Sequence, residues 1–145
     1  MKIIEMQKDL FEMGDDYHLA HCISGDYAMG VGTAKRFDKE MNMRFELFKN
    51  YPIPIGCRHV PVGCALLIDR VFNLVTKGTR YDKVDEDVLF RAIYNMRELC
   101  ESLHIQKLAM TKLACGRDKM QWKDVRPIIE NVFEDMDIEI VVCYI

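Results

Sequence analysis

The sequence has no excess of one charge, no long apolar run and no paired cysteine motif. Its 20 basic and 23 acidic residues leave a formal net charge of −3, which excludes a protein that grips nucleic acid chiefly by neutralising phosphates. No apolar run approaches the ~20 residues needed to cross a bilayer, and the opening residues lack the apolar stretch of a secretion signal. These absences predict a cytoplasmic protein with no membrane partner.

Six cysteines stand at positions 22, 57, 64, 100, 115 and 143, and none forms a CxxC pair. Without an export signal we expect a reducing compartment, in which most of these thiols are small buried side chains. Two groups of His and Cys could suggest a metal: His18, His21 and Cys22, and Cys57, His59 and Cys64. Neither has the paired ligand spacing of a structural zinc site, so we predict neither a metal nor a cofactor.

The chain of 145 residues, 50% of them hydrophobic, has no repeat and no linker, which predicts one domain spanning residues 1–145. Strands are expected at 2–6, 17–23, 107–111 and 139–144, and residues 64–76 should form two strands joined by a turn at Asp69-Arg70. Helical spacing of apolar residues predicts a helix at 33–41, a helix capped by Asp85 or Asp87 that continues to Leu103, and a helix with its apolar stripe from Val125 to Met136. Pro127 lies near the start of that last helix, so its first turn should be irregular.

This order of strands and helices predicts an α/β fold, with the apolar strand 139–144 in the centre of the sheet. In such sheets, ligands bind beyond the carboxyl ends of the strands. The turns that follow Met6, Ile23 and Thr111 are therefore the places to look for a site.

Two of these turns hold glycines before a helix. Gly30 and Gly32 precede the first helix, and Gly116 follows Cys115 before the last one. Glycines allow the backbone to approach a ligand closely, and a helix start offers free N–H groups to a phosphate. The sequence has no third glycine at 35 and no Gly-Lys-Ser/Thr, so neither a dinucleotide-fold fingerprint nor a P-loop is present. Two such turns together favour a pyrophosphate ligand.

Two charged residues at strand ends have two possible roles each. Asp9 is either a turn former or a carboxylate that accepts a hydrogen bond from an exocyclic amine such as that of adenine. Lys77 is either a solvated surface residue or a reactive amine, which requires desolvation or a neighbouring charge.

Four segments resemble the macro domain family, and most of all its terminal ADP-ribose protein glycohydrolase branch, which includes antitoxin macro domains that reverse DNA ADP-ribosylation. The branch has Gly-Asp-Leu-Phe after its first strand, similar to residues 8–11 here, and His-Cys-Ile-Ser-x-Asp-x-x-Met-Gly-x-Gly-x-Ala, similar to residues 21–34. Its strand-ending Thr-Lys matches Thr76-Lys77, and its Gly-Cys-Gly-Leu-Asp-x-x-x-Trp resembles residues 114–122. The likeness covers nearly the whole chain in the same order.

The resemblance implies a three-layer α/β/α macro domain with a mixed, roughly six-stranded sheet, and an ADP-ribose pocket in which Asp9 reads adenine. It implies that Lys77 attacks the anomeric carbon of the distal ribose and that Asp118 assists as acid and base. The ligand-binding residues that it implies are Asp9, Leu10, His21, Ser24, Met29, Gly30, Gly32, Thr33, Ala34, Leu113, Ala114, Cys115, Gly116, Arg117 and Ile145.

Three residues depart from the family pattern. Lys8 and Ala114 stand where the branch has glycine, and Arg117 stands where it has leucine. Arg117 either pairs with Asp118 and lowers the pKa of that carboxyl, or binds a phosphate.

The resemblance implies a hydrolase that removes ADP-ribose from acidic side chains, from an acyl group or from nucleic acid, with nucleic acid only as a modified substrate. Two alternatives remain open: a reader that binds ADP-ribose without turnover, and a phosphatase that acts on ADP-ribose phosphate. We expect a monomer.

Overall fold

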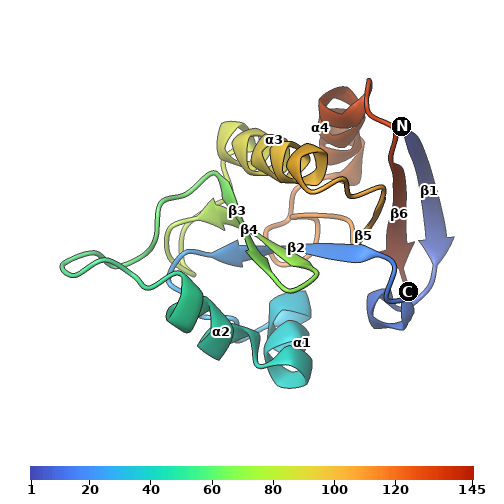
Figure 1. Cartoon of the computed structure of the whole chain (residues 1–145). Coiled ribbons are helices and arrows are strands. Elements are labelled where there is room, and N and C mark those ends of the chain that lie inside the picture. Colours follow the sequence, from blue (N-terminus) through green and yellow to red (C-terminus); the bar gives the residue numbers. More distant parts are fainter.

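The computed structural model describes all residues from 1 to 145. Its strands form one mixed six-stranded sheet (Figure 1). The strand order is β1-β6-β5-β2-β4-β3. The strands are β1 (Lys2–Gln7), β2 (His18–Ser24), β3 (Cys64–Ile68), β4 (Val71–Lys77), β5 (Lys107–Met110) and β6 (Glu139–Tyr144). All neighbouring pairs are parallel except β3 and β4, which are antiparallel. Every strand expected from the sequence is present, and Asp69, with φ 50°, turns the chain between β3 and β4.

Helices cover both faces of this sheet (Figure 1). The helices are the short 3-10 helix η1 (Leu10–Glu12) and the α-helices α1 (Gly32–Met41), α2 (Met43–Asn50), α3 (Glu86–Ser102) and α4 (Trp122–Phe133). The α3 and α4 helices lie on one face, and α1 and α2 lie on the other. The predicted three-layer α/β/α arrangement is therefore confirmed. No helix is both long enough and apolar enough to cross a membrane.

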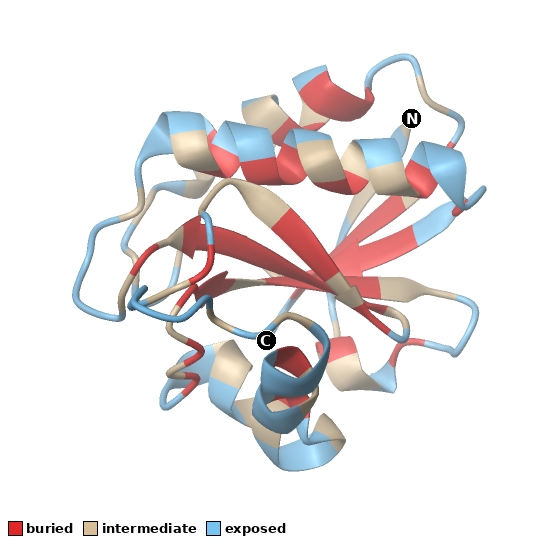
Figure 2. Ribbon diagram, turned by 60° about the vertical axis from the view of Figure 1, so that its left-hand side comes forward, coloured by how far each residue is buried: buried red, intermediate tan, exposed pale blue.

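The core consists of two apolar clusters, one on each side of the sheet (Figure 2). Ile93 and Ile129 bring α3 and α4 into the first cluster, and Phe37 and Leu47 bring α1 and α2 into the second. Parallel strands covered on both faces are apolar along their whole length, as in β4, where every residue from Val71 to Thr76 is buried. The predicted central position of 139–144 is confirmed, because β6 lies between β1 and β5.

Three details of the helices differ from expectation. The last helix begins at Trp122, so Pro127 lies inside it and not in its first turn. It ends at Phe133, and Met136 packs against the core from beyond its end. The α2 helix was not predicted at all, because only Met43 and Leu47 among its eight residues are buried.

Of the two possible caps of α3, Asp85 is the one used, and it accepts a hydrogen bond from the N–H of Asp87 at 2.8 Å.

All six cysteines are free thiols. Cys100 and Cys143 are buried, Cys57 is exposed, and the other three are half-buried. The expectation that most of the cysteines are buried is therefore wrong, because only two of the six are.

Candidate active site

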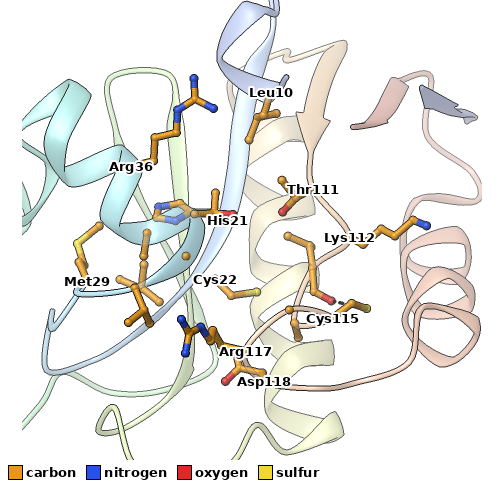
Figure 3. Close-up of a pocket in the computed structure, with 18 of the residues that line it drawn as sticks. Leu10, His21, Cys22, Met29, Arg36, Thr111, Lys112, Cys115, Arg117 and Asp118 are labelled. Atoms are coloured by element: carbon orange, nitrogen blue, oxygen red, sulfur yellow. Dashed lines mark hydrogen bonds between the residues drawn. The ribbon is translucent and has the colours of Figure 1, made fainter. Parts of the chain in front are cut away.

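A cavity of about 1220 Å³ opens at the carboxyl ends of the parallel strands, where the sequence predicted a site (Figure 3). Its walls come from the turns after β1, β2, β4 and β5 and from residues 143–145. Every ligand-binding residue implied by the family resemblance lines this cavity, from Asp9 through to Ile145, and so do Lys77 and Asp118. Segments far apart in the sequence thus meet around one space, and the roles of these residues remain predictions.

One end of the cavity holds Asp9, directly after β1. Its Oδ1 accepts a hydrogen bond from the N–H of Phe11 at 3.0 Å, so Asp9 caps η1 as the turn-forming reading expected. The same carboxylate pairs with Arg36 of α1, whose Nη1 and Nη2 lie 2.7 Å from Oδ1 and Oδ2. The hydrogen bond from Arg36, followed by that from Phe11, holds the pKa of Asp9 below its usual value. Asp9 therefore faces the cavity as an anion.

His21 of β2 lies in the middle of the wall and is uncharged. It is 1% exposed, it stacks on Phe37 with 4.0 Å between ring centroids, and its Nε2 lies 2.5 Å from Asn73 Oδ1. Burial lowers the pKa of His21 to about 4, and the hydrogen bond to Asn73 opposes this shift only in part. Because the amide Nδ2 of Asn73 donates to Leu66 O at 3.1 Å, Oδ1 must accept the Nε2 proton. The Nδ1 atom is then a buried acceptor that has no partner within the chain.

The loop after β2 is held in a strained shape by Asp26. Its Oδ1 accepts from the Ser24 hydroxyl at 2.5 Å and from the N–H of Ala28 at 3.1 Å, and its Oδ2 accepts from the N–H of Arg80 at 3.0 Å. Burial alone would raise the pKa of Asp26, but these hydrogen bonds outweigh it and the pKa is lowered. Met29 has a positive φ of 46°, a conformation costly for any residue with a side chain. The ionised Asp26 and its donors stabilise this turn.

The α1 helix begins at Gly32 with free N–H groups at the cavity. Its N-cap, Val31, makes no side-chain hydrogen bond, and no acidic residue stands in the first turn. Gly32, Thr33 and Ala34 all line the cavity. Unpaired N–H groups at a helix start, together with the helix dipole, attract an anion.

The loop between β5 and α4 forms the opposing wall. Ala114 has φ 61°, the left-handed conformation that explains why the family pattern has glycine at this position. The N–H groups of Gly116 and Arg117 donate to no backbone carbonyl. The cavity therefore lies between two groups of unpaired N–H donors, as the two glycine-bearing turns predicted.

Lys77 and Asp118 form an ion pair at the other end of the cavity. Lys77 Nζ lies 2.7 Å from Asp118 Oδ1, and the two side chains are only 15% and 16% exposed. Lys77 ends β4, where the pairing with β2 is irregular: Ile23 pairs with Val75, but Ser24 pairs with Lys77. Such bulges redirect side chains at the ends of strands. Sequence alone could not show that these two residues meet, because 41 positions separate them.

Arg117 lines the same cavity but is paired with no carboxylate. No ion pair joins it to Asp118, whose partner is Lys77; of the two readings of Arg117, the one in which it pairs with Asp118 is wrong. Figure 3 shows the Arg117 side chain beside Asp118 among the residues that line the cavity. Its Cγ lies close enough to Gly32 that a Cβ added there would be 3.9 Å away. Arg117 thus lies between the loop after β5, to which it belongs, and the start of α1 at Gly32.

Several lining residues were not found from the sequence. They include Phe11, Arg36, Arg80, Tyr81, Thr111, Lys112 and Tyr144. Arg36 stood in the predicted helix 33–41 without any motif to mark it. The apolar spacing of that helix shows which face is buried, but not which polar residue reaches a distant loop.

No three side chains of His, Cys, Asp or Glu come together in a way that could hold a metal ion. His21 and Cys22 both line the cavity, where burial raises the pKa of the Cys22 thiol to about 12. The chemistry available in the cavity is that of an amine, a carboxylate and backbone N–H donors.

Two relatives show the family of the chain, although no family model matches it. The human ADP-ribose glycohydrolase OARD1 is 31% identical over 145 residues, covering 97% of this chain and 90% of that protein. The bovine protein of the same name has the same identity and coverage.

Solved structures show the same fold. The macrodomain of Mycobacterium tuberculosis DarG aligns with a TM-score of 0.81 at 18% identity, covering 97% of this chain and 96% of that one. Thermosipho africanus DarTG, solved in complex with ADP-ribose, aligns with a TM-score of 0.78 at 15% identity and covers 98% of this chain and 41% of that one. Taken with the sequence relatives and the six-stranded sheet, these structures establish that the chain belongs to the macro domain family, alongside the ADP-ribose glycohydrolase OARD1.

Proposed function

We propose that the cavity binds ADP-ribose and that the protein hydrolyses the bond between the distal ribose and an attached group. The observation that carries this proposal is the Lys77–Asp118 ion pair, 2.7 Å apart, in a cavity between two loops suited to phosphate. The name of the relative OARD1 and the ADP-ribose bound to DarTG support the choice of ligand. In this proposal Asp9 marks the adenine end and Lys77 the distal ribose end.

The charge of the cavity supports an anionic ligand although the whole chain is acidic. Among the lining residues six are basic and two are acidic: Lys8, Arg36, Lys77, Arg80, Lys112 and Arg117, against Asp9 and Asp118. Lys8 and Arg117 take part in no ion pair with another residue, whereas the other four do. The two free cations and the unpaired N–H groups are available to neutralise a pyrophosphate.

The ion pair also provides a route to a nucleophile. Asp118 takes a proton from Lys77 across the 2.7 Å contact, and the neutral Nζ attacks the anomeric carbon of the distal ribose. The bond from that carbon to the leaving oxygen breaks, and the carboxylate or phosphate departs with the bonding electrons. As the ribose opens, Asp118 gives its proton to the ring oxygen and takes one proton back from Nζ, which leaves a protonated Schiff base on Lys77. Water adds to the Schiff base and releases ADP-ribose and the free amine.

The leaving group belongs to the class of weak bases. A carboxylate on a glutamate or aspartate side chain, an acyl group, or a nucleic-acid phosphate each departs as a stable anion. A binding module has no use for a half-buried amine beside a carboxylate, since burial of an ion pair seldom adds stability.

The test is to incubate the protein with O-acetyl-ADP-ribose, with glutamate-ADP-ribosylated protein and with ADP-ribosylated DNA, and to identify the products. Release of ADP-ribose from any of them supports hydrolysis, and borohydride trapping followed by mass spectrometry should find the ribose adduct on Lys77. Binding without release would favour a reader, and release of phosphate only from ADP-ribose phosphate would favour a phosphatase.

A further inference from the structure

Arg36 and Asp9 form a forked ion pair at the end of the cavity away from Lys77. Two guanidinium nitrogens of Arg36 each lie 2.7 Å from a different oxygen of Asp9. The planar fork of arginine matches a carboxylate in this way, which fixes the direction of the carboxylate as well as its charge. The pair joins α1 to the turn after β1, across 27 positions of the sequence.

The guanidinium of Arg36 also lies over an aromatic ring. Its Cζ is 4.3 Å from the centroid of the Phe11 ring, which in turn lies 4.5 Å from that of Phe37. Phe11 covers one side of the plane, yet the Arg36 side chain is still 41% exposed and lines the cavity. Figure 3 shows Arg36 extending from α1 along the cavity wall toward η1, above His21. The Arg36 side chain is therefore partly available to a ligand in the cavity.

The Asp9 carboxylate can still accept one hydrogen bond. A carboxylate offers about four acceptor positions. Oδ1 accepts from the N–H of Phe11 and from Arg36, and Oδ2 accepts from Arg36 alone. One position on Oδ2 remains, and its direction is set by the fork.

We infer that Arg36 determines base specificity, because it fixes the free acceptor of Asp9 toward an exocyclic amine and offers the exposed part of its guanidinium for the base to stack on. This inference rests on the proposed function, in which Asp9 reads the adenine of ADP-ribose. In this inference Arg36 acts on the base through Asp9. The fork then explains why the base must carry an amino group at its 6-position.

The inference predicts discrimination between two bases of nearly equal shape. Adenine carries an amine at the 6-position, whereas hypoxanthine carries a carbonyl oxygen, which would meet the remaining acceptor of Asp9 without a proton between them. Sites that present a buried or fixed polar group to one substrate reject an analogue that leaves the group unpaired.

The experiment measures, by calorimetry, the binding of ADP-ribose and of its inosine analogue to the full chain. We expect the unmodified protein to prefer ADP-ribose by at least about tenfold. Arg36→Ala should weaken ADP-ribose binding by about tenfold and lower the preference to a few-fold. Arg36→Lys should have the same effect on the preference, because lysine keeps the charge but cannot form the fork. Lys35→Ala, which removes a neighbouring exposed charge from the same helix outside the cavity, should change neither quantity.

A background without Asp9 separates positioning from stacking. In Asp9→Ala, adding Arg36→Ala should leave the preference between the two ligands unchanged, since Arg36 sets it through Asp9. An unchanged preference in Arg36→Ala alone, or tighter ADP-ribose binding by that variant, would overturn the inference while leaving the proposed function intact. If the unmodified protein binds neither ligand, the proposed function and this inference both fail.

Discussion

The two ends of the cavity each hold one cation paired with one carboxylate, but the two pairs differ in geometry and in burial. At one end Arg36 forks onto both oxygens of Asp9, and these side chains are 41% and 24% exposed. At the other end Lys77 makes a single contact with Asp118, and both side chains are largely buried. An arginine does not give up its proton in a protein, whereas a lysine can. The first pair can therefore only hold a position, whereas the second can also move a proton.

The largest expected effect comes from replacing Lys77. Lys77→Ala should lower turnover of an ADP-ribosyl ester on the order of 10³-fold and leave ADP-ribose affinity nearly unchanged, because backbone N–H groups and the start of α1 can hold the pyrophosphate. Lys77→Arg is the sharper variant, since it keeps the cation beside Asp118 but removes the transferable proton. Single-turnover kinetics and calorimetry measure the two quantities. A wild-type rate in either variant would show that the two ends do not differ in chemistry.

Asp118 should behave differently from Lys77. In the proposed mechanism Asp118 accepts the Lys77 proton and lies beside the distal ribose. In Asp118→Ala both turnover and affinity should therefore fall, turnover on the order of 10²-fold. The variant also leaves a half-buried ammonium without its partner, which lowers stability. Thermal unfolding should accompany the kinetic assay. Loss of turnover with full affinity would place Asp118 in catalysis alone.

The region between the two pairs should respond to pH, because His21 is neutral when folded. Its pKa is about 4 in the folded chain against 6.5 in the unfolded one. The unfolded state therefore binds the extra proton first, and stability that is complete above pH 6.5 is lost as the pH falls toward 4. The free energy of unfolding should drop on the order of 3 kcal/mol over this range. Urea unfolding at several pH values measures the slope. The dependence of the free energy of unfolding on pH should become weaker in His21→Gln. It should remain in His104→Asn, which replaces an exposed histidine.

At the Arg36 end, removing the carboxylate should affect binding and not chemistry. Asp9→Ala should bind ADP-ribose roughly tenfold to a hundredfold more weakly, because a hydrogen bond to a charged group is lost. Its turnover at saturating substrate should match that of the unmodified protein. Steady-state kinetics would reveal a raised KM with an unchanged kcat. Wild-type affinity in this variant would reject the role of Asp9 in reading adenine.

The smallest expected effect concerns the backbone at the Lys77 end. Ala114 has φ 61°, so Ala114→Gly relieves a strained conformation and should raise the free energy of unfolding by about 1 kcal/mol. Ala109→Gly, in the regular strand β5, should have the opposite sign. Denaturant unfolding compares the two. A lower stability for Ala114→Gly would show that the loop does not carry strain.

Much of the fold followed from local patterns. The strand at Glu139–Tyr144 was predicted with its observed bounds, because a run of buried apolar residues with β propensity has few alternatives. The helix α2 was missed because Phe45 and Phe48 are exposed on it and obscure the spacing of its two buried residues. Pro127 was placed wrongly because Lys123 and Asp124 separate Trp122, the first residue of α4, from the apolar stripe that begins at Val125.

The residues of the candidate site were predicted from motifs that resemble a family, and not from the spacing of apolar residues. The residues around Lys77 and Asp118 were found because whole segments resemble a family, and their contact depends on the order of the strands in the sheet. Arg36 was not found, since its partner Asp9 lies on another element and only the packing of α1 against the sheet brings them together. The reading in which Arg117 pairs with Asp118 was wrong because Lys77, from the end of β4, takes the place of Arg117 as the partner of that carboxylate.

The position of β6 has a consequence for synthesis on the ribosome. The strand β1 has β6 as its only neighbour in the sheet, and β6 is the last element of this sequence to be made. While residues 8–138 emerge, β1 has no strand to pair with, and Asp9 directly after it has no fixed place. β2, β4 and β3 can pair much earlier, since their contacts close within residues 18–77. The end that holds Lys77 can therefore begin to assemble during translation, whereas the end that holds Asp9 must wait for the final strand.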